Sequence, residues 1–150
     1  MPSSVPVRKT EHMGHTIQII TEITADDYTD SLEVSYPCSY SFDGQIHRLK
    51  YTDDEAGFTV FKILPDGGIE IRRRNSFTIF YRKGVPHSVS YESEFGTIPM
   101  TFTLLDAEHS LTEEGGSIRF SARVTVDGEP QINKTTMRLT LNERNDNSHD

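Results

Sequence analysis

Apolar and polar positions alternate along most of this chain. The clearest run has six apolar or aromatic side chains separated by single small or polar residues: Leu32, Val34, Tyr36, Cys38, Tyr40 and Phe42. Successive side chains of an extended strand point to opposite faces, so this period of two predicts a strand with one buried face and one solvated face. No segment shows the period of a long helix, and we therefore expect an all-β protein.

Turn residues divide the chain into about ten short strands. Asp43-Gly44 is the strongest signal, because both residue types tolerate positive φ and form two-residue hairpin turns. The predicted strands cover residues 16–25, 31–42, 45–53, 58–64, 69–74, 77–81, 89–95, 98–104, 117–126 and 137–141. Short connections leave no room for crossover helices, which favours a single antiparallel up-and-down (meander) β-barrel, with a two-sheet sandwich as the alternative.

Two of these strands have irregular patterns. Residues 58–64 carry apolar side chains on both faces, which predicts either a bulge or a strand that is covered on both sides. Pro37 falls on the outward face of its strand and has no backbone N–H to donate. We therefore expect the second strand to be bulged or locally unpaired beside Cys38.

Length and charge narrow the class of protein. The 150 residues suit one barrel domain over residues 15–143, with a flexible N-terminal arm at 1–14 and a disordered tail at 144–150. Fifteen basic against 23 acidic side chains give a net charge of -8, which disfavours nucleic acid and anionic membranes as partners. Cys38 is the only cysteine, and no apolar stretch has the length of a membrane span, so we expect a cytoplasmic protein without disulfides.

Three short motifs in order carry a family resemblance. They are the strand end Tyr51-Thr52-Asp53, the arginine-rich strand end Arg72-Arg73-Arg74-Asn75, and YESEFG at residues 91–96. Together with residues 97–126, they resemble the YwiB-like domains of unknown function over roughly residues 17–142. The resemblance implies a calycin-like barrel, akin to lipocalins and fatty-acid-binding proteins, in a small soluble bacterial protein. It implies no established activity, and the family's usual Arg-x-Gly is replaced here by residues 73–75.

The inward faces of the predicted strands supply the candidate ligand-binding residues. They are Tyr36, Cys38, Tyr40, Tyr51, Arg73, Tyr91 and Phe102. Inside a barrel, the phenols and the one guanidinium would orient the polar head of a partly apolar ligand, with Arg73 pairing with an anionic group such as a carboxylate. The alternative is a barrel whose interior is filled by its own side chains. The leading prediction is a small-molecule-binding protein that is not an enzyme.

Other chemistry has weaker support in the sequence. Cys38 has no nearby base, the histidines are scattered, and no cofactor motif is present, so we expect no catalytic residues, no metal and no cofactor. Arg72 and Arg74 share one face of their strand and Arg73 faces the other, which weakens a nucleic-acid patch. Two alternatives stay open: a solid-core homodimer that associates through an edge or outer face, and an enzyme that uses the tyrosine and arginine cluster.

Overall fold

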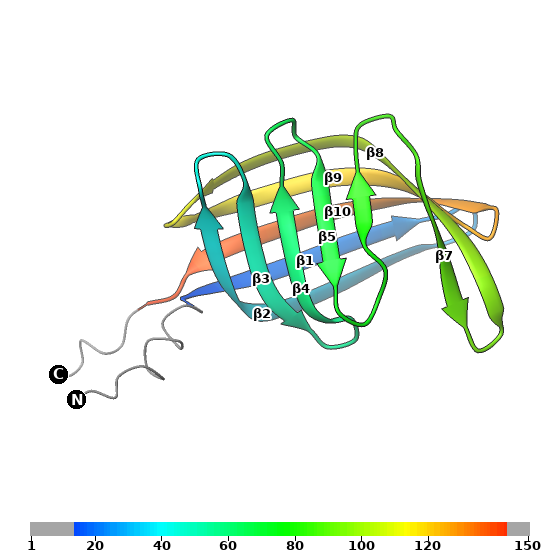
Figure 1. Cartoon of the computed structure of the whole chain (residues 1–150), viewed down its shortest axis with the longest axis horizontal. Coiled ribbons are helices and arrows are strands. Elements are labelled where there is room, and N and C mark those ends of the chain that lie inside the picture. The colour runs from blue at the N-terminus through cyan, green and yellow to red at the C-terminus, as the bar shows by residue number, and fades with distance from the viewer. Residues whose placement is uncertain (1–13, 144–150) are drawn as a thin grey trace.

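The computed structural model describes residues 14–143, which form ten antiparallel strands and no helix (Figure 1). The strands are β1 (His15–Thr24), β2 (Thr29–Phe42), β3 (His47–Asp53), β4 (Gly57–Ile63), β5 (Ile69–Arg73), β6 (Ile79–Tyr81), β7 (His87–Ser93), β8 (Gly96–Thr112), β9 (Gly115–Val126) and β10 (Glu129–Leu141). The predicted arm at 1–14 and tail at 144–150 lie outside the described residues, except for Gly14. Within residues 14–143, no helix is long and apolar enough to cross a membrane.

The strands form a nearly closed meander, as the sequence predicted. Their order is β6-β5-β4-β3-β2-β1-β10-β9-β8-β7, so the first and last strands of the chain pair and join the two halves of the sheet. The one break lies between β6 and β7. A parallel bridge between Lys83 and Leu104, with the Gly84 N–H donating to the Leu104 carbonyl at 2.9 Å, partly bridges this break.

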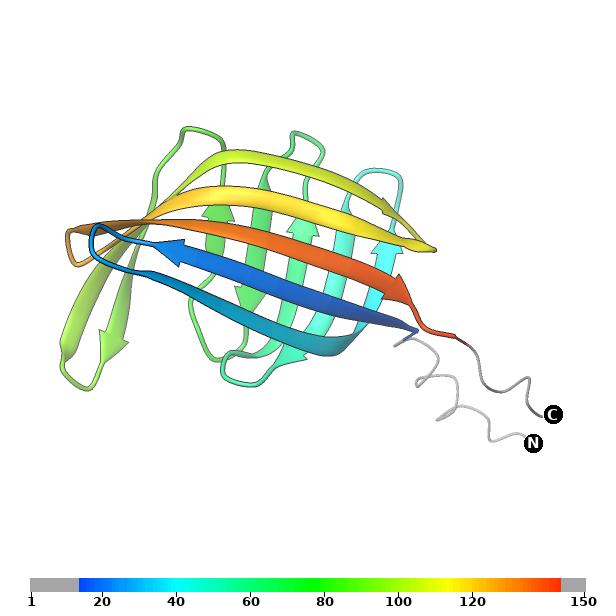
Figure 2. The same ribbon diagram turned by 180° about the vertical axis from the view of Figure 1, so that it is seen from behind.

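The barrel is flattened into two layers that cross each other. Figure 1 shows β3, β4 and β5 in front of the longer β1, β9 and β10, and Figure 2 shows the same long strands from behind. β2 belongs to both layers, because Thr29–Cys38 pairs with β1 whereas Ser39–Phe42 pairs with β3. The corner of the barrel is therefore at Cys38–Ser39.

The structure confirms one predicted irregularity and corrects the other. Pro37 pairs in regular register with Thr16, so β2 has no bulge there, but its pairing with β3 begins only at Ser39, so β2 is unpaired on that side beside Cys38, as predicted. β4 also pairs regularly with β3 and β5. Its outward residue Phe58 is 44% exposed, so β4 is neither bulged nor covered on both faces. The irregularity that does occur is in β8, between Leu104 and Asp106.

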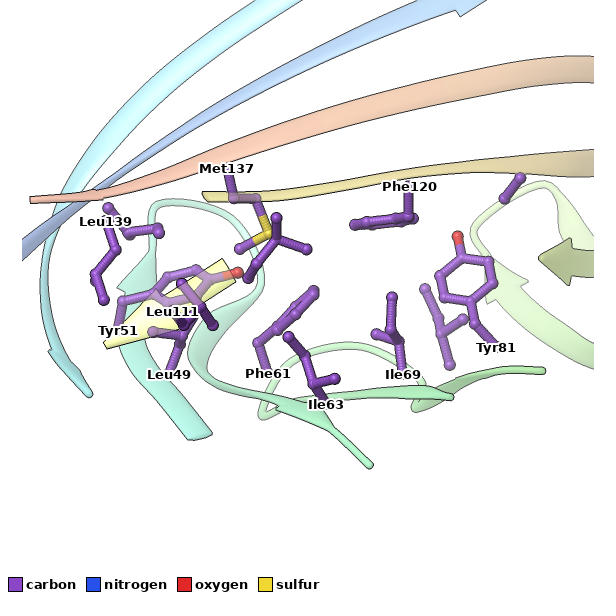
Figure 3. Packing of buried hydrophobic residues seen from close by; sticks show 14 of the residues in the cluster. Leu49, Tyr51, Phe61, Ile63, Ile69, Tyr81, Leu111, Phe120, Met137 and Leu139 are labelled. Atoms are coloured by element: carbon purple, nitrogen blue, oxygen red, sulfur yellow. The ribbon is translucent and has the colours of Figure 1, made fainter. Parts of the chain in front are cut away.

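Buried side chains of the two layers meet in the barrel interior (Figure 3). The Phe61 ring on β4 lies 6.0 Å from the Phe120 ring on β9, and the Tyr81 ring on β6 lies 5.6 Å from Phe120. Leu49 and Ile63 extend this packing along the front layer, and both are at most 3% exposed. Close packing of this kind fills one part of the interior and leaves the rest of the barrel for a cavity.

Candidate functional site

A cavity of about 580 Å³ lies between the two layers. Seven of its wall residues are aromatic. They come from both layers and from the turn between β5 and β6: Tyr36, Tyr51, Phe61, Phe77, Tyr81, Phe102 and Phe120. The space exists because β2 and β3 separate below the pair Ser39–Lys50, where their backbone pairing ends. The residues of the β3–β4 turn, Asp54 and Glu55, form part of its rim.

Arg73 is the cationic side chain among the residues of the cavity wall. It occupies the inward position at the end of β5, whereas its neighbour Arg72 points outward and pairs with Glu70. The Arg73 Cζ atom lies 5.2 Å from the centre of the Phe77 ring, in a cation–π contact. Its Nε is buried without a hydrogen-bond partner, and no salt bridge within residues 14–143 includes Arg73.

Burial dominates the electrostatics of this guanidinium. Desolvation lowers the pKa of Arg73, and the nearby Tyr51, Tyr81 and Asp53 oppose that effect. An arginine side chain stays protonated in proteins, so the result is a fixed positive charge in an unfavourable environment. Among residues 14–143, no side chain forms a salt bridge with Arg73 and its Nε has no hydrogen-bond partner, so this charge is available to an incoming acceptor.

The tyrosines at the cavity wall are neutral hydrogen-bonding groups. The Tyr36 and Tyr51 rings are stacked, with centres 5.6 Å apart and planes 9° from parallel. Burial raises the pKa of Tyr51 far above its ordinary value, and burial raises the pKa of Tyr81 to about 12 although Arg73 acts in the opposite direction. Each phenol therefore keeps its proton at neutral pH and can donate one hydrogen bond.

Asp53 holds the rim of the cavity in place through hydrogen bonds. Its Oδ1 accepts hydrogen bonds from the N–H groups of Glu55 and Ala56, both at 2.8 Å, and its Oδ2 accepts one from the Tyr36 hydroxyl at 3.3 Å. Burial acts to raise the pKa of Asp53, but these hydrogen bonds and the charge of Arg73 outweigh it and lower the pKa. Asp53 is therefore an ionised group that holds the β3–β4 turn, and it is poorly suited to act as a general base.

The structure brings together four of the seven predicted site residues: Tyr36, Tyr51, Arg73 and Phe102 line the cavity. Cys38 is fully buried outside the cavity wall, and burial raises the pKa of its thiol to about 12. Tyr40 also lies outside it, since its strand has turned the corner at Cys38 and its hydroxyl contacts His47 Nδ1 at 2.8 Å. Tyr91 is 43% exposed on β7 and reaches the site only through an edge contact with Phe77. Face alternation alone does not give the depth of a residue along the barrel axis.

Phe77 lines the cavity although it was not among the predicted site residues. It lies in the turn between β5 and β6, where it contacts both Arg73 and Phe102. Phe77 lies four residues after Arg73, and the intervening turn returns the chain toward β5. This spacing could have indicated from the sequence that the two side chains are in contact. Within the part of the chain that the structure describes, no group of three or more histidine, cysteine or acidic side chains is placed to hold a metal ion.

The molecule is a small, flattened, antiparallel β-barrel domain. The cavity between its two layers has one arginine in its wall and is a candidate small-molecule site. The chain belongs to the family described as Domain of unknown function (DUF1934), whose model matches residues 17–139. The crystal structure of the YwiB protein from Bacillus subtilis superposes with a TM-score of 0.74 and 16% identity, over 86% of this chain and 92% of that one. No curated protein matches this chain. The predicted resemblance to the YwiB-like domains is thereby confirmed, and at this identity the structural likeness shows the fold.

Proposed function

We propose that this protein binds a small, largely apolar molecule with a single anionic head group in its barrel cavity. The observation that carries the proposal is the state of Arg73: its Nε is buried and unpartnered, and its guanidinium lies over the Phe77 ring at the cavity wall. An unsatisfied buried donor costs stability, typically about 1–3 kcal/mol. A carboxylate or similar acceptor would satisfy it and pair with the fork of the guanidinium.

The size and walls of the cavity suit such a molecule. Its volume of about 580 Å³ lies within the range of about 300–1,000 Å³ that is usual for small-molecule sites. Ile71, Ile79 and Met100 add aliphatic surface to the aromatic walls. These side chains would contact the apolar body of the ligand, while the neutral hydroxyls of Tyr51 and Tyr81 offer hydrogen bonds near its head.

The charges at the rim narrow the ligand class further. Glu33, Asp54 and Glu55 are exposed rim residues, and they face a cavity that holds one arginine. Carboxylates at a mouth repel anions in proportion to their charge. We therefore expect a monoanion with an apolar body, and we expect polyanions such as nucleotides to be excluded from the cavity.

Fluorescence titration with anilinonaphthalene sulfonate, an apolar monoanion, tests this function. Arg73→Gln removes the charge at the cavity wall, and Arg74→Gln is the matched control because Arg74 is exposed on the opposite face of the strand. We expect affinity to fall at least about tenfold in Arg73→Gln, since hydrogen bonds to charged groups are worth about 1.5–3 kcal/mol, and to be unchanged in Arg74→Gln. Equal affinity in both variants, or no binding to the wild type, would contradict the proposal.

Native mass spectrometry of protein purified from its own host gives an independent test. A co-purifying small molecule that is lost in Arg73→Gln supports the cavity as its site. The homodimer and the tyrosine–arginine enzyme stay predictions. The outward apolar residues Ile20 and Leu105, which a homodimer could cover, are half-buried in the single chain.

A further inference from the structure

The outer face of the front layer is basic although the protein is acidic. This face, formed by the outward residues of β3, β4, β5 and β6, is turned toward the reader in Figure 1. Within these four strands its charged residues are four basic side chains and one acidic side chain: Arg48, Lys50, Lys62, Arg72 and Glu70. Arg74, whose N–H donates to the Phe58 carbonyl at 2.9 Å, follows directly after β5. The chain as a whole has a net charge of -8.

The strand register gathers these side chains into one patch. Lys50 pairs with Val60, which pairs with Arg72, so two cations flank one half-buried apolar residue. Neighbouring strands lie about 4.8 Å apart, and residues on one face of a strand repeat about every 6.6 Å. The Cα atoms of the basic residues on β3, β4 and β5 therefore lie within roughly 12 Å of one another.

Several of these charges are not neutralised by the protein. Lys62 and Arg72 share Glu70, which is 8% exposed, so one carboxylate serves two cations. Lys50 and Arg74 are exposed and take part in no salt bridge within residues 14–143. The patch therefore keeps a net positive charge toward solvent.

Exposed aromatic rings accompany the basic groups. Phe58 on β4 is 44% exposed and Phe80 on β6 is 37% exposed, and both occupy outward positions. Phe58 and Phe80 are two interstrand spacings apart across the sheet and four residues apart along the strand direction, which corresponds to roughly 16 Å. Phe58 is therefore one of the apolar residues on the second face of β4, which the barrel core does not use.

We propose that this face binds single-stranded nucleic acid, with Lys50, Arg72 and Arg74 contacting phosphates and Phe58 and Phe80 stacking against bases. Positively charged surfaces that carry exposed aromatic rings bind single strands by this combination of contacts, without a need for sequence-specific readout. The sequence led us to expect no nucleic acid, because the three consecutive arginines alternate between faces. That expectation also rested on the net charge of -8. The sheet adds Arg48, Lys50 and Lys62 from separate segments to the two outward arginines, and the proposal makes this face a local exception to the overall charge.

The back of the barrel provides a natural comparison (Figure 2). The outward positions of β9 and β10 carry four exposed basic residues, Arg119, Arg123, Lys134 and Arg138. Their outward residues within these two strands include no aromatic side chain. Basic residues therefore occur on both faces, but on the back face the outward acidic residues Glu22, Asp106 and Glu108 lie opposite Lys134, Ser121 and Arg119 on the neighbouring strands. Exposed phenylalanine and an excess of basic residues distinguish the front face.

Fluorescence anisotropy with a labelled single-stranded RNA of about twelve nucleotides and mixed sequence tests the proposal. About three phosphate contacts predict that log affinity falls with log salt concentration with a slope of about -2. Lys50→Glu with Arg74→Glu should weaken binding at least about tenfold and flatten this slope. The matched double variant Arg119→Glu with Arg123→Glu makes the same charge change on the back face and should alter affinity less than about threefold.

Phe58→Ser tests the stacking contribution separately. It should weaken binding about fivefold or more while the salt slope stays as in the wild type, because it removes a ring and no charge. Thermal melting checks that each variant folds, and all substituted residues are exposed. The RNA should bind Arg73→Gln as it binds the wild type, so failure here is distinct from failure of the proposed cavity ligand.

Four results would overturn the proposal. They are absence of RNA binding at low salt, equal loss in the front and back double variants, unchanged affinity in Phe58→Ser, and displacement of the RNA by poly-glutamate at equal charge concentration. The last result would assign the face to an acidic protein segment.

Discussion

Arg73 lies in a mostly apolar cavity, and its replacement by methionine distinguishes a residue kept for binding from one kept for stability. Methionine has a similar length and fills irregular space, so Arg73→Met removes the charge with little loss of packing. We expect the free energy of unfolding to stay equal to that of the wild type or to increase. The physical reason is that burial acts against this charge and lowers its pKa.

The magnitude follows from the contacts of the side chain. The substitution loses the cation–π contact with Phe77, worth about 0.5–1 kcal/mol at a partly exposed position. It removes the buried, unpartnered Nε, whose cost is typically about 1–3 kcal/mol. Arg73 is only half-buried, so both values lie toward the lower end of their ranges. The expected change is between zero and about 2 kcal/mol of added stability.

Denaturant unfolding followed by circular dichroism or tyrosine fluorescence measures the change, since the chain contains no tryptophan. Phe61→Ala is a suitable control, because Phe61 is 1% exposed and such truncations cost about 3–5 kcal/mol. If Arg73→Met lowered the free energy of unfolding by more than about 1.5 kcal/mol, which exceeds the cation–π contribution, the guanidinium would stabilise the fold. The inference that it is kept for a ligand would then be refuted.

Three further predictions concern stability and reactivity. Gly116→Ala should lower the free energy of unfolding by about 3–5 kcal/mol, because φ is +144° and a Cβ atom would lie 1.8 Å from the Ser110 carbonyl oxygen. Gly128→Ala, where φ is +85° and the space is open, should lower it by about 1–2 kcal/mol. Equal losses in denaturant unfolding would contradict this. Cys38 is fully buried, and burial raises the pKa of its thiol to about 12. A disulfide reagent should therefore modify it only after unfolding. Rapid modification of the native protein would show that the thiol is not buried. Burial, with a contribution from the neighbouring His109, lowers the pKa of His47, so folding favours its neutral form. The contribution of His47 to stability should be complete above the ordinary histidine pKa and decrease as the pH falls below it. If a His47→Gln variant showed the same pH dependence of melting temperature as the wild type, this reasoning would be refuted.

Local patterns predicted a large part of this fold. The alternation at residues 31–42 correctly indicated β2, and Asp43-Gly44 correctly indicated its hairpin with β3. The predicted two-residue turn was wrong, because Phe42 pairs with His47 and the connection contains residues 43–46. The opposite orientations of Arg72 and Arg73 also followed from the alternation of side chains along a strand. The correct predictions hold because strand face and turn position depend on neighbouring residues alone.

The site depended on relations that no local pattern contains. Tyr36 and Tyr40 occupy the same face of β2, yet the corner at Cys38–Ser39 places one at the cavity and the other beside His47. The direction in which a strand bends is decided by its partners on each side, and those partners are distant in sequence. Parity therefore predicted which residues face inward, and the bend decided which of them line the cavity.

Alternation and turn chemistry, which are local features of the chain, specify the set of strands, their order in a meander and the inward side of each. The tertiary structure decided the separation of β2 from β3 that opens the cavity beside Arg73. It also decided that Lys50, Lys62 and Arg72 share one outer surface. Both outcomes arise from the register and crossing of strands, and these are set when the two layers bury their apolar faces against each other.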